Sequence, residues 1–112
     1  MDISFEQSPA GTTIIRLLGR MDVMGAMQID VRFAAVAAAN RAVIVDLAGV
    51  EFMASMGLRT LIMGAKSVKA KSGRMVLYRP AAMVEEVLVT SGTSTLIPVT
   101  HDMDEAETLA LG

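Results

Sequence analysis

The amino-acid sequence predicts an α/β domain built on a mixed β-sheet, and three observations carry this prediction. Segments with strand periodicity alternate along the chain with segments of helical periodicity, which is the pattern of an α/β layer. The run Ala42–Leu47 (AVIVDL) is apolar and rich in β-branched residues, as expected of a strand buried on both faces. The chain has 112 residues, 53% of them hydrophobic, which suits one compact domain.

The first 40 residues predict a hairpin followed by a helix. Residues 3–7 alternate between apolar and polar side chains, residues 8–11 (SPAG) form a turn cluster, and residues 12–18 resume a β-rich run. Asp22 is placed to cap a helix over residues 23–39. The residues expected on its core face are Ala26, Ile29, Phe33 and Val36.

After the buried run, the pattern predicts a second helix from Met56 to Lys71, which Ser72-Gly73 ends. A strand over residues 75–78 follows, and Pro80 begins a helix that reaches Val89. The expected core residues of the second helix are Leu58, Leu61, Ile62, Ala65 and Val68.

The last segment predicts a short edge strand and a closing helix. Residues 96–99 are the strand candidate, and Pro98 places them at an edge because proline cannot donate to a ladder. Residues 102–105 (DMDE) resemble a capping box that opens a helix to Ala110.

Composition excludes several functional classes. The chain has no cysteine, which excludes disulfides and thiolate chemistry. Its 10 basic and 12 acidic residues give a formal charge of −2, so we expect no nucleic-acid partner. No apolar run approaches the roughly 20 residues of a membrane span, and residues 1–7 (MDISFEQ) do not resemble a signal peptide. We therefore expect a cytoplasmic protein that does not insert into membranes.

Catalytic and metal-binding signals are sparse. His101 is the one histidine, and a lone histidine beside a helix start is far more often a surface residue than a catalyst. No cluster has metal-ligand spacing, and no glycine-rich loop fits a phosphate-binding or dinucleotide-binding motif. The sequence therefore predicts that the chain is not an enzyme and uses neither metal nor cofactor.

One segment carries a more specific signal. Residues 45–58 (VDLAGVEFMASMGL) place Ser55 after a buried strand and a short loop, where the next helix begins. This segment resembles the signature of the STAS family, the domain of anti-sigma factor antagonists and of sulphate-transporter tails. Residues 18–22 (LGRMD) resemble the family's motif after the second strand, and residues 73–80 and the last helix match later segments. The resemblance covers residues 1–112 as a single STAS domain.

This resemblance implies a fold and a function. The fold is a mixed sheet of four to five strands flanked by about four helices. In bacterial members the domain binds an anti-sigma factor, often a serine kinase, which phosphorylates the first serine of an Asp-Ser-Ser/Thr-Gly loop and thereby ends binding. Ser55 occupies that serine position, Gly57 the loop glycine and Asp22 the aspartate of the neighbouring loop. Two positions depart, because Ala54 replaces the family aspartate and Met56 the second Ser/Thr.

The residues of this loop also have a purely structural interpretation. A serine at a helix start is a typical N-cap, and we expect Ser55 to be one, which is compatible with phosphorylation. Met27, Met63 and Met75 are expected to fill gaps in an alanine-rich core, whereas an exposed contact role is as plausible for Met24 and Met56. The residues expected to contact the partner are Arg20, Asp22, Met24, Met53, Ala54, Met56, Gly57 and Arg59.

These residues support two functions from different classes. The first, which we favour, is an anti-sigma factor antagonist that phosphorylation of Ser55 switches off. The alternative is a STAS subunit of a transporter or signalling assembly that binds without phosphorylation, a hypothesis favoured by Ala54 and Met56. A small enzyme or ligand sensor is disfavoured because no catalytic constellation is present.

Overall fold

The computed structural model describes residues 1–112 as one five-stranded mixed sheet with five helices. The strands are β1 (Asp2–Gln7), β2 (Thr13–Met21), β3 (Ala42–Met53), β4 (Arg74–Tyr78) and β5 (Val99–Thr100). The helices are α1 (Val23–Ala39), α2 (Ser55–Lys69), α3 (Ala82–Thr90), α4 (Thr93–Leu96) and α5 (Met103–Leu111). The strand order is β1-β2-β3-β4-β5, and only the β1–β2 pair is antiparallel. The predicted α/β class and the N-terminal hairpin are confirmed.

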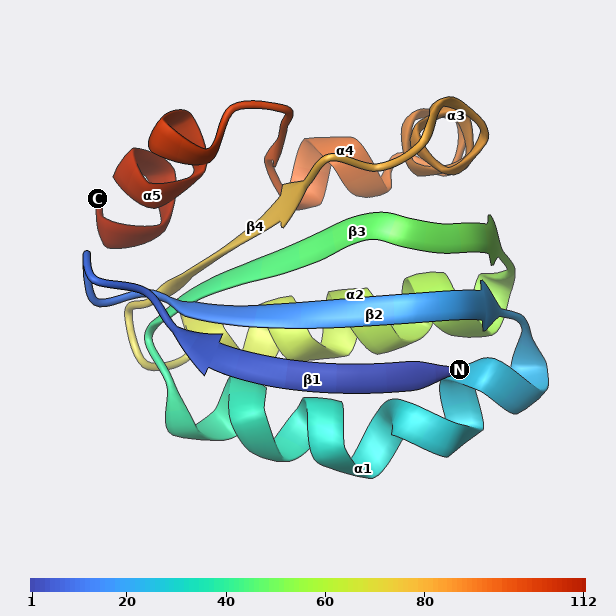
Figure 1. The fold of residues 1–112 in the computed structure, drawn as a ribbon, viewed down its shortest axis with the longest axis horizontal. Helices are drawn as coiled ribbons and strands as arrows, with labels where there is room; N and C mark the ends of the chain where they lie inside the picture. Colours follow the sequence, from blue (N-terminus) through green and yellow to red (C-terminus); the bar gives the residue numbers. More distant parts are fainter.

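Helices cover the sheet on two sides. Helices α1 and α2 run side by side and pack with the main core, whereas α5 packs across β3 and β4 in a second cluster (Figure 1). The consequence is clearest in β3, where Val43 and Val45 belong to the main core and Ile44 belongs to the α5 cluster. All three side chains are fully buried, which confirms the prediction of a strand buried on both faces.

Strands β2 and β3 are longer than the sequence predicts. Strand β3 continues past Leu47 to Met53, so the segment expected to be a loop is strand. Parallel pairing with β2 extends it, because β2 itself continues past Leu18 to Met21, with register shifts on the way. Gly49 leaves room for the Leu18 side chain, because a Cβ there would lie 2.1 Å from the Leu18 Cδ2 atom. The Ala48-Gly49 break in the apolar run favoured a loop here, and pairing between distant segments overrode it.

A three-strand network supports the region before these shifts. The Arg16 guanidinium on β2 pairs with Glu6 on β1 and, at 3.3 Å, with Asp46 on β3. The Asp46 carboxylate also accepts a hydrogen bond from the Ala48 backbone N–H over 3.0 Å. One cation therefore ties together the three strands that lead to the end of the sheet described below.

Several helix boundaries differ from the predictions. Helix α2 ends at Lys69, and the left-handed residue after it is Ser72 (φ 63°) rather than Gly73. Gly73 is needed for space, because a Cβ there would lie 2.3 Å from the Arg41 carbonyl oxygen. Helix α3 begins at Ala82 rather than Pro80.

The predicted strand at residues 96–99 is wrong in its bounds. Residues 93–96 form the short helix α4, and β5 contains only Val99 and Thr100. Its edge position is confirmed, because Pro98 precedes it and β5 pairs with β4 alone. On α1, Ala37 is fully buried, while Val36 is only half-buried. No helix is long and apolar enough to cross a membrane.

Candidate functional site

The sequence-predicted site lies where β2 and β3 end. These strands are parallel neighbours, so both end at the same edge of the sheet, where α1 and α2 begin (Figure 1). The Ala54 backbone N–H donates a hydrogen bond to the Met21 carbonyl oxygen over 3.0 Å and joins the two strand ends. The structure therefore brings the Asp22 and Ser55 segments together, although they are far apart in the chain.

Asp22 is the N-cap of α1, as predicted. Its Oδ1 atom accepts a hydrogen bond from the Gly25 backbone N–H over 2.8 Å. Its Oδ2 atom lies 3.7 Å from Arg20 Nε, and the Arg20 guanidinium carbon lies 4.5 Å from the centroid of the Phe52 ring. Arg20 is thus held between an acid and an aromatic ring of its own chain, with its side chain more than half exposed.

Two glycines let the helix starts approach the strand ends closely. A Cβ on Gly25 would lie 2.0 Å from the Arg20 carbonyl oxygen. A Cβ on Gly57 would lie 2.6 Å from Met53 Sδ and 2.8 Å from Met21 Cγ. Gly57 is itself buried, so at this position the backbone of α2 lies close to the strand ends and no side chain reaches the surface.

Ser55 is not the N-cap of α2, which corrects the prediction. Ala54 occupies the cap position in an extended conformation (φ −103°, ψ 174°), and no side chain caps the helix. Helix α2 begins one residue earlier than predicted, at Ser55 rather than Met56, and Ala54 alone separates it from the end of β3 at Met53. The Ser55 side chain is exposed, and its hydroxyl has no hydrogen-bond partner within the chain.

The start of α2 also leaves backbone donors free. Its first intrahelical bond runs from the Leu58 N–H to the Ala54 carbonyl over 3.1 Å. The N–H groups of Ser55, Met56 and Gly57 therefore have no acceptor inside the helix. These groups and the helix dipole favour negative charge beside Ser55.

The methionines of this junction divide into buried and exposed groups. Met53 was expected to contact the partner, but it is 4% exposed and its Sδ atom packs against Gly57 inside the domain. Met21 is fully buried beside it. Met24 and Met56 are 67% and 38% exposed, so both reach the surface. A partner on this surface would contact Met24 and Met56 and not Met53.

Two other methionines correct the core prediction. Met27 and Met63 are 65% and 56% exposed, so neither fills a gap in the core. Met75 is 4% exposed and belongs to the main core, as predicted. Met27 on α1 and Met63 on α2 instead line the grooves described next.

Two shallow grooves flank α2. One, of about 420 Å³, lies between α2 and the α3–α4 segment; the other, of about 240 Å³, lies between α1 and α2. The first is lined by Ser55, Leu58, Arg59, Ile62, Met63, Lys66, Ser91 and Thr93. The second is lined by Ala26, Met27, Asp30, Ala34, Met56, Arg59, Thr60 and Met63. Arg59 and Met63 line both grooves and form the ridge between them.

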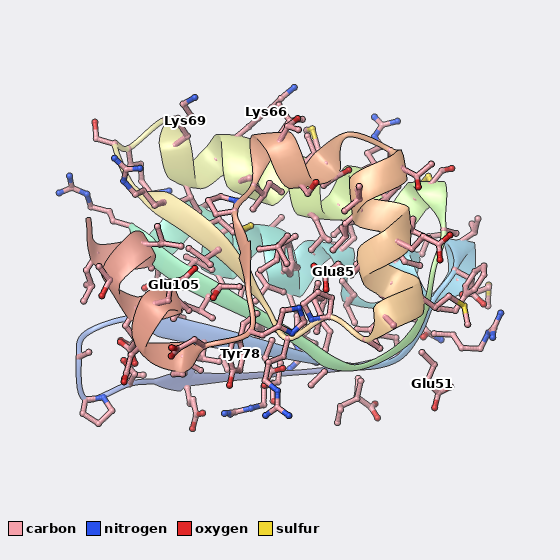
Figure 2. All side chains as sticks on the ribbon, turned by 90° about the horizontal axis from the view of Figure 1, so that it is seen from above. Glu51, Lys66, Lys69, Tyr78, Glu85 and Glu105 are labelled. Carbon is pink, nitrogen blue, oxygen red and sulfur yellow. The ribbon has the colours of Figure 1, made fainter.

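Helix α2 is basic and has no acid to neutralise it. Residues 55–69 contain Arg59, Lys66 and Lys69 and no aspartate or glutamate. None of the four ion pairs of the structure involves α2. Figure 2 shows Lys66 and Lys69 projecting outward from this helix, away from the labelled acids Glu85 and Glu105. A partner with acidic side chains would complement this surface.

His101 pairs with a residue of α3 and not with the residues around Asp22 and Ser55. Its Nε2 atom lies 2.6 Å from Glu85 Oε1 on α3, and both side chains are partly exposed. No group of three or more histidine, cysteine, aspartate and glutamate side chains comes together as a metal site.

Comparison with known proteins assigns the family. A sequence model of the STAS domain matches residues 4–106. The chain belongs to the STAS domain family. It is 31% identical over 97 residues to BtrV of Bordetella bronchiseptica, which carries the name of an anti-sigma factor antagonist; the match covers 86% of this chain and 84% of BtrV.

Solved STAS structures share the fold. An anti-sigma factor antagonist STAS protein from Planctomyces limnophilus is 26% identical, with a TM-score of 0.83, and the match covers 95% of this chain and 94% of that one. The antagonist SpoIIAA in its unphosphorylated form is 22% identical, with a TM-score of 0.78 and coverage of 96% and 95%. SpoIIAA in its phosphorylated form has a TM-score of 0.71 at 21% identity, with coverage of 96% and 98%.

Sequence reasoning missed part of this STAS surface. Ser91 and Thr93 line the larger groove opposite Ser55, and their hydroxyls lie 2.8 Å apart. Asp30 lines the smaller groove, where its carboxylate accepts a hydrogen bond from the Thr60 hydroxyl over 3.4 Å. These residues come from distant segments, so only the packing of the helices places them beside the junction.

Proposed function

We propose that this STAS domain is an anti-sigma factor antagonist, which binds an anti-sigma factor and is released from it when Ser55 is phosphorylated. The observation that carries the proposal is the exposed, unbonded hydroxyl of Ser55 at the first residue of α2. The relationship to BtrV and the likeness to SpoIIAA in unphosphorylated and phosphorylated forms support it. Residues 1–112 act as one domain, in the cytoplasm.

The proposed role is regulatory and needs no catalytic group on this chain. The anti-sigma factor acts as a serine kinase, and the chain supplies the acceptor. The Ser55 Oγ atom attacks the γ-phosphorus of ATP, the bond from that phosphorus to the β–γ bridging oxygen breaks and ADP leaves, while the hydroxyl proton passes to a base of the kinase. The new phosphate carries roughly −1.5 to −2 charges at neutral pH.

The fold tolerates this charge, whereas a bound partner would not. At a helix N-terminus a negative charge is favourable by about 0.3–1 kcal/mol, and the free N–H groups of α2 lie beside it. Burying the same charge without a partner group inside an interface costs at least several kcal/mol. Since 1.4 kcal/mol corresponds to a tenfold change in affinity, phosphorylation weakens binding without unfolding the domain.

The contact surface consists of groups that reach solvent around Ser55. Met24 and Met56 supply adaptable apolar area, which suits partner binding. Arg20 and Arg59 supply cations, and the Asp22 carboxylate is partly exposed beside Arg20. Ala54 is partly exposed beside Ser55, whereas Gly57 is buried against Met21 and Met53 and supports this surface from inside the domain.

The test is a binding measurement with the purified anti-sigma factor of the same organism. We expect Ser55→Asp to weaken binding about tenfold or more, as an unpaired charge enters the interface. Ser55→Ala and Ser4→Asp are controls expected to bind like the wild type, because the first adds no charge and the second adds it on an exposed site of β1. Equal binding by wild type and Ser55→Asp would refute the switch.

A second measurement locates the phosphate. After incubation with ATP and the anti-sigma factor, tandem mass spectrometry should place the phosphoryl group on Ser55. A phosphoryl group on Ser4, Ser67, Ser72 or Ser91 instead would contradict the proposed site.

One observation favours the alternative function, a STAS subunit that binds without phosphorylation. Ser55 stands between two apolar residues, Ala54 and Met56, in place of the acid and hydroxyl of the family motif. If Ser55 stays unmodified while a transporter or signalling protein binds the domain, this alternative replaces the switch.

A further inference from the structure

Arg59 and Ser55 lie on the same side of helix α2. The two residues are four positions apart on α2, so their side chains share one face of the helix. Both line the groove between α2 and the α3–α4 segment. Arg59 therefore lies within reach of any group attached to the Ser55 hydroxyl.

The Arg59 guanidinium is also uncommitted. It takes part in no ion pair and no hydrogen bond within the chain, and α2 holds no acid. Asp30 lines the smaller groove with Arg59, but no ion pair forms between the two side chains. A cation on the ridge between two grooves is thus free to bind a carboxylate or a phosphate.

We propose that the group bound by the Arg59 guanidinium depends on whether Ser55 is phosphorylated. When Ser55 is unmodified, the guanidinium binds a carboxylate of the anti-sigma factor docked on α2. When Ser55 is phosphorylated, the guanidinium turns to the phosphate one helical turn away and is withdrawn from the partner. The proposal rests on the proposed function, since it concerns the same serine and the same partner.

Two physical arguments support this exchange. An acid placed four residues before a base is the favourable orientation for a pair on a helix. Arginine binds phosphate through two parallel hydrogen bonds, which makes the pair stronger and more directional than a single contact. Phosphorylation thus acts twice, because it adds negative charge to the interface and removes a cation that the partner needs.

The first test requires no partner and no kinase. Phosphoserine is incorporated at position 55 during translation, and the second pKa of the phosphate is measured by ³¹P NMR. An ion pair with Arg59 stabilises the dianion, so this pKa should be lower with Arg59 than in Arg59→Gln, by about 0.5 unit for an exposed pair. The helix N-terminus is the same in both proteins, so the difference isolates Arg59.

Two variants serve as controls. Lys66→Gln also removes one positive charge from the same groove. Lys66 lies about 16 Å from Ser55 along the helix axis, so the pKa of the Ser55 phosphate should not change. Arg59→Lys keeps the charge and should retain part of the shift. Equal pKa values in the wild type and Arg59→Gln would overturn the proposal, as would an equal shift in Lys66→Gln.

The second test uses the purified anti-sigma factor and a double-mutant cycle. We expect Arg59→Gln to weaken binding several-fold, and Ser55→Glu to have a smaller effect in the Arg59→Gln background than in the wild type. Equal effects of Ser55→Glu in the two backgrounds would overturn the role of Arg59 while the switch stands. If Ser55→Glu has no effect in either background, the proposed function itself fails, and the ³¹P result still reports the pairing.

Discussion

The Ala54 backbone N–H donates a 3.0 Å hydrogen bond to the Met21 carbonyl oxygen. This one bond joins the last residue of β2 to the residue that precedes α2, so two distant segments start their helices side by side. Each segment places a glycine three residues further on, Gly25 after Asp22 and Gly57 after Ala54. The surface around Ser55 depends on this pair of close approaches.

The first prediction concerns these glycines. Gly25→Ala places a Cβ 2.0 Å from a backbone carbonyl oxygen, which moves only if β2 or α1 shifts. We expect it to lower the free energy of unfolding by about 3 kcal/mol or more. Gly57→Ala meets Met53 Sδ at 2.6 Å and the Cγ and carbonyl oxygen of buried Met21 at 2.8 and 3.0 Å, so it should also destabilise, but less than Gly25→Ala, by about 1–3 kcal/mol. Urea denaturation checks this order, and equal stability of Gly25→Ala and the wild type would contradict it.

The second prediction compares a free serine with a true cap. The Ser55 hydroxyl makes no hydrogen bond within the chain, so Ser55→Ala should change the free energy of unfolding by less than about 0.5 kcal/mol. Asp102 caps α5 by accepting a 2.9 Å hydrogen bond from the Asp104 N–H. Asp102→Ala should therefore cost about 0.5–2 kcal/mol. Thermal unfolding of the two variants measures this contrast, which a large loss in Ser55→Ala would refute.

The third prediction uses the missing cap of α2. Ala54 already has the extended backbone of an N-cap, so Ala54→Asp should supply the absent side-chain acceptor. We expect a gain of about 1 kcal/mol in the free energy of unfolding. Ala70→Asp is the matched control at the other end of α2, where the helix dipole makes an acid unfavourable by about 0.3–1 kcal/mol. Opposite signs in urea denaturation would support the assigned helix start, and a loss in both would not.

The fourth prediction separates surface from core methionines. Met63 is exposed on the ridge of α2, so Met63→Ala should change stability by less than about 0.5 kcal/mol. Met75 is buried in the main core, so Met75→Ala should cost about 2–5 kcal/mol. Equal losses in the two variants, measured by urea denaturation, would mean that Met63 packs as a core residue.

Local sequence features predicted the elements whose cause is local. The Asp22 cap depends on a short polar side chain before a helix-periodic segment, and the structure confirms it. The burial of Val43, Ile44 and Val45 on both faces of the sheet depends on a run of consecutive β-branched apolar residues, which the sequence shows directly. The resemblance of residues 45–58 to the STAS signature likewise identified the family that comparison confirms.

The errors share a non-local cause. Residues 48–53 look like a loop because Ala48-Gly49 breaks the apolar run, yet pairing with β2 makes them strand. Ala54 alone links this longer strand to α2, so Ser55 is the first helical residue rather than the cap. Met27 and Met63 have apolar side chains but lie outside the buried faces of α1 and α2. Which faces are buried depends on how these two helices pack.

The sequence by itself determined the order of the strands and of the longer helices, the Asp22 and Asp102 caps, the twice-buried strand and the family, because each depends on residues close together in the chain. The tertiary structure decided which of those residues meet. Parallel pairing of β2 and β3 brought Asp22 beside Ser55, and the packing of α2 against α1 and α3–α4 formed the two grooves. Those contacts depend on register and helix packing between distant segments, which no local pattern encodes.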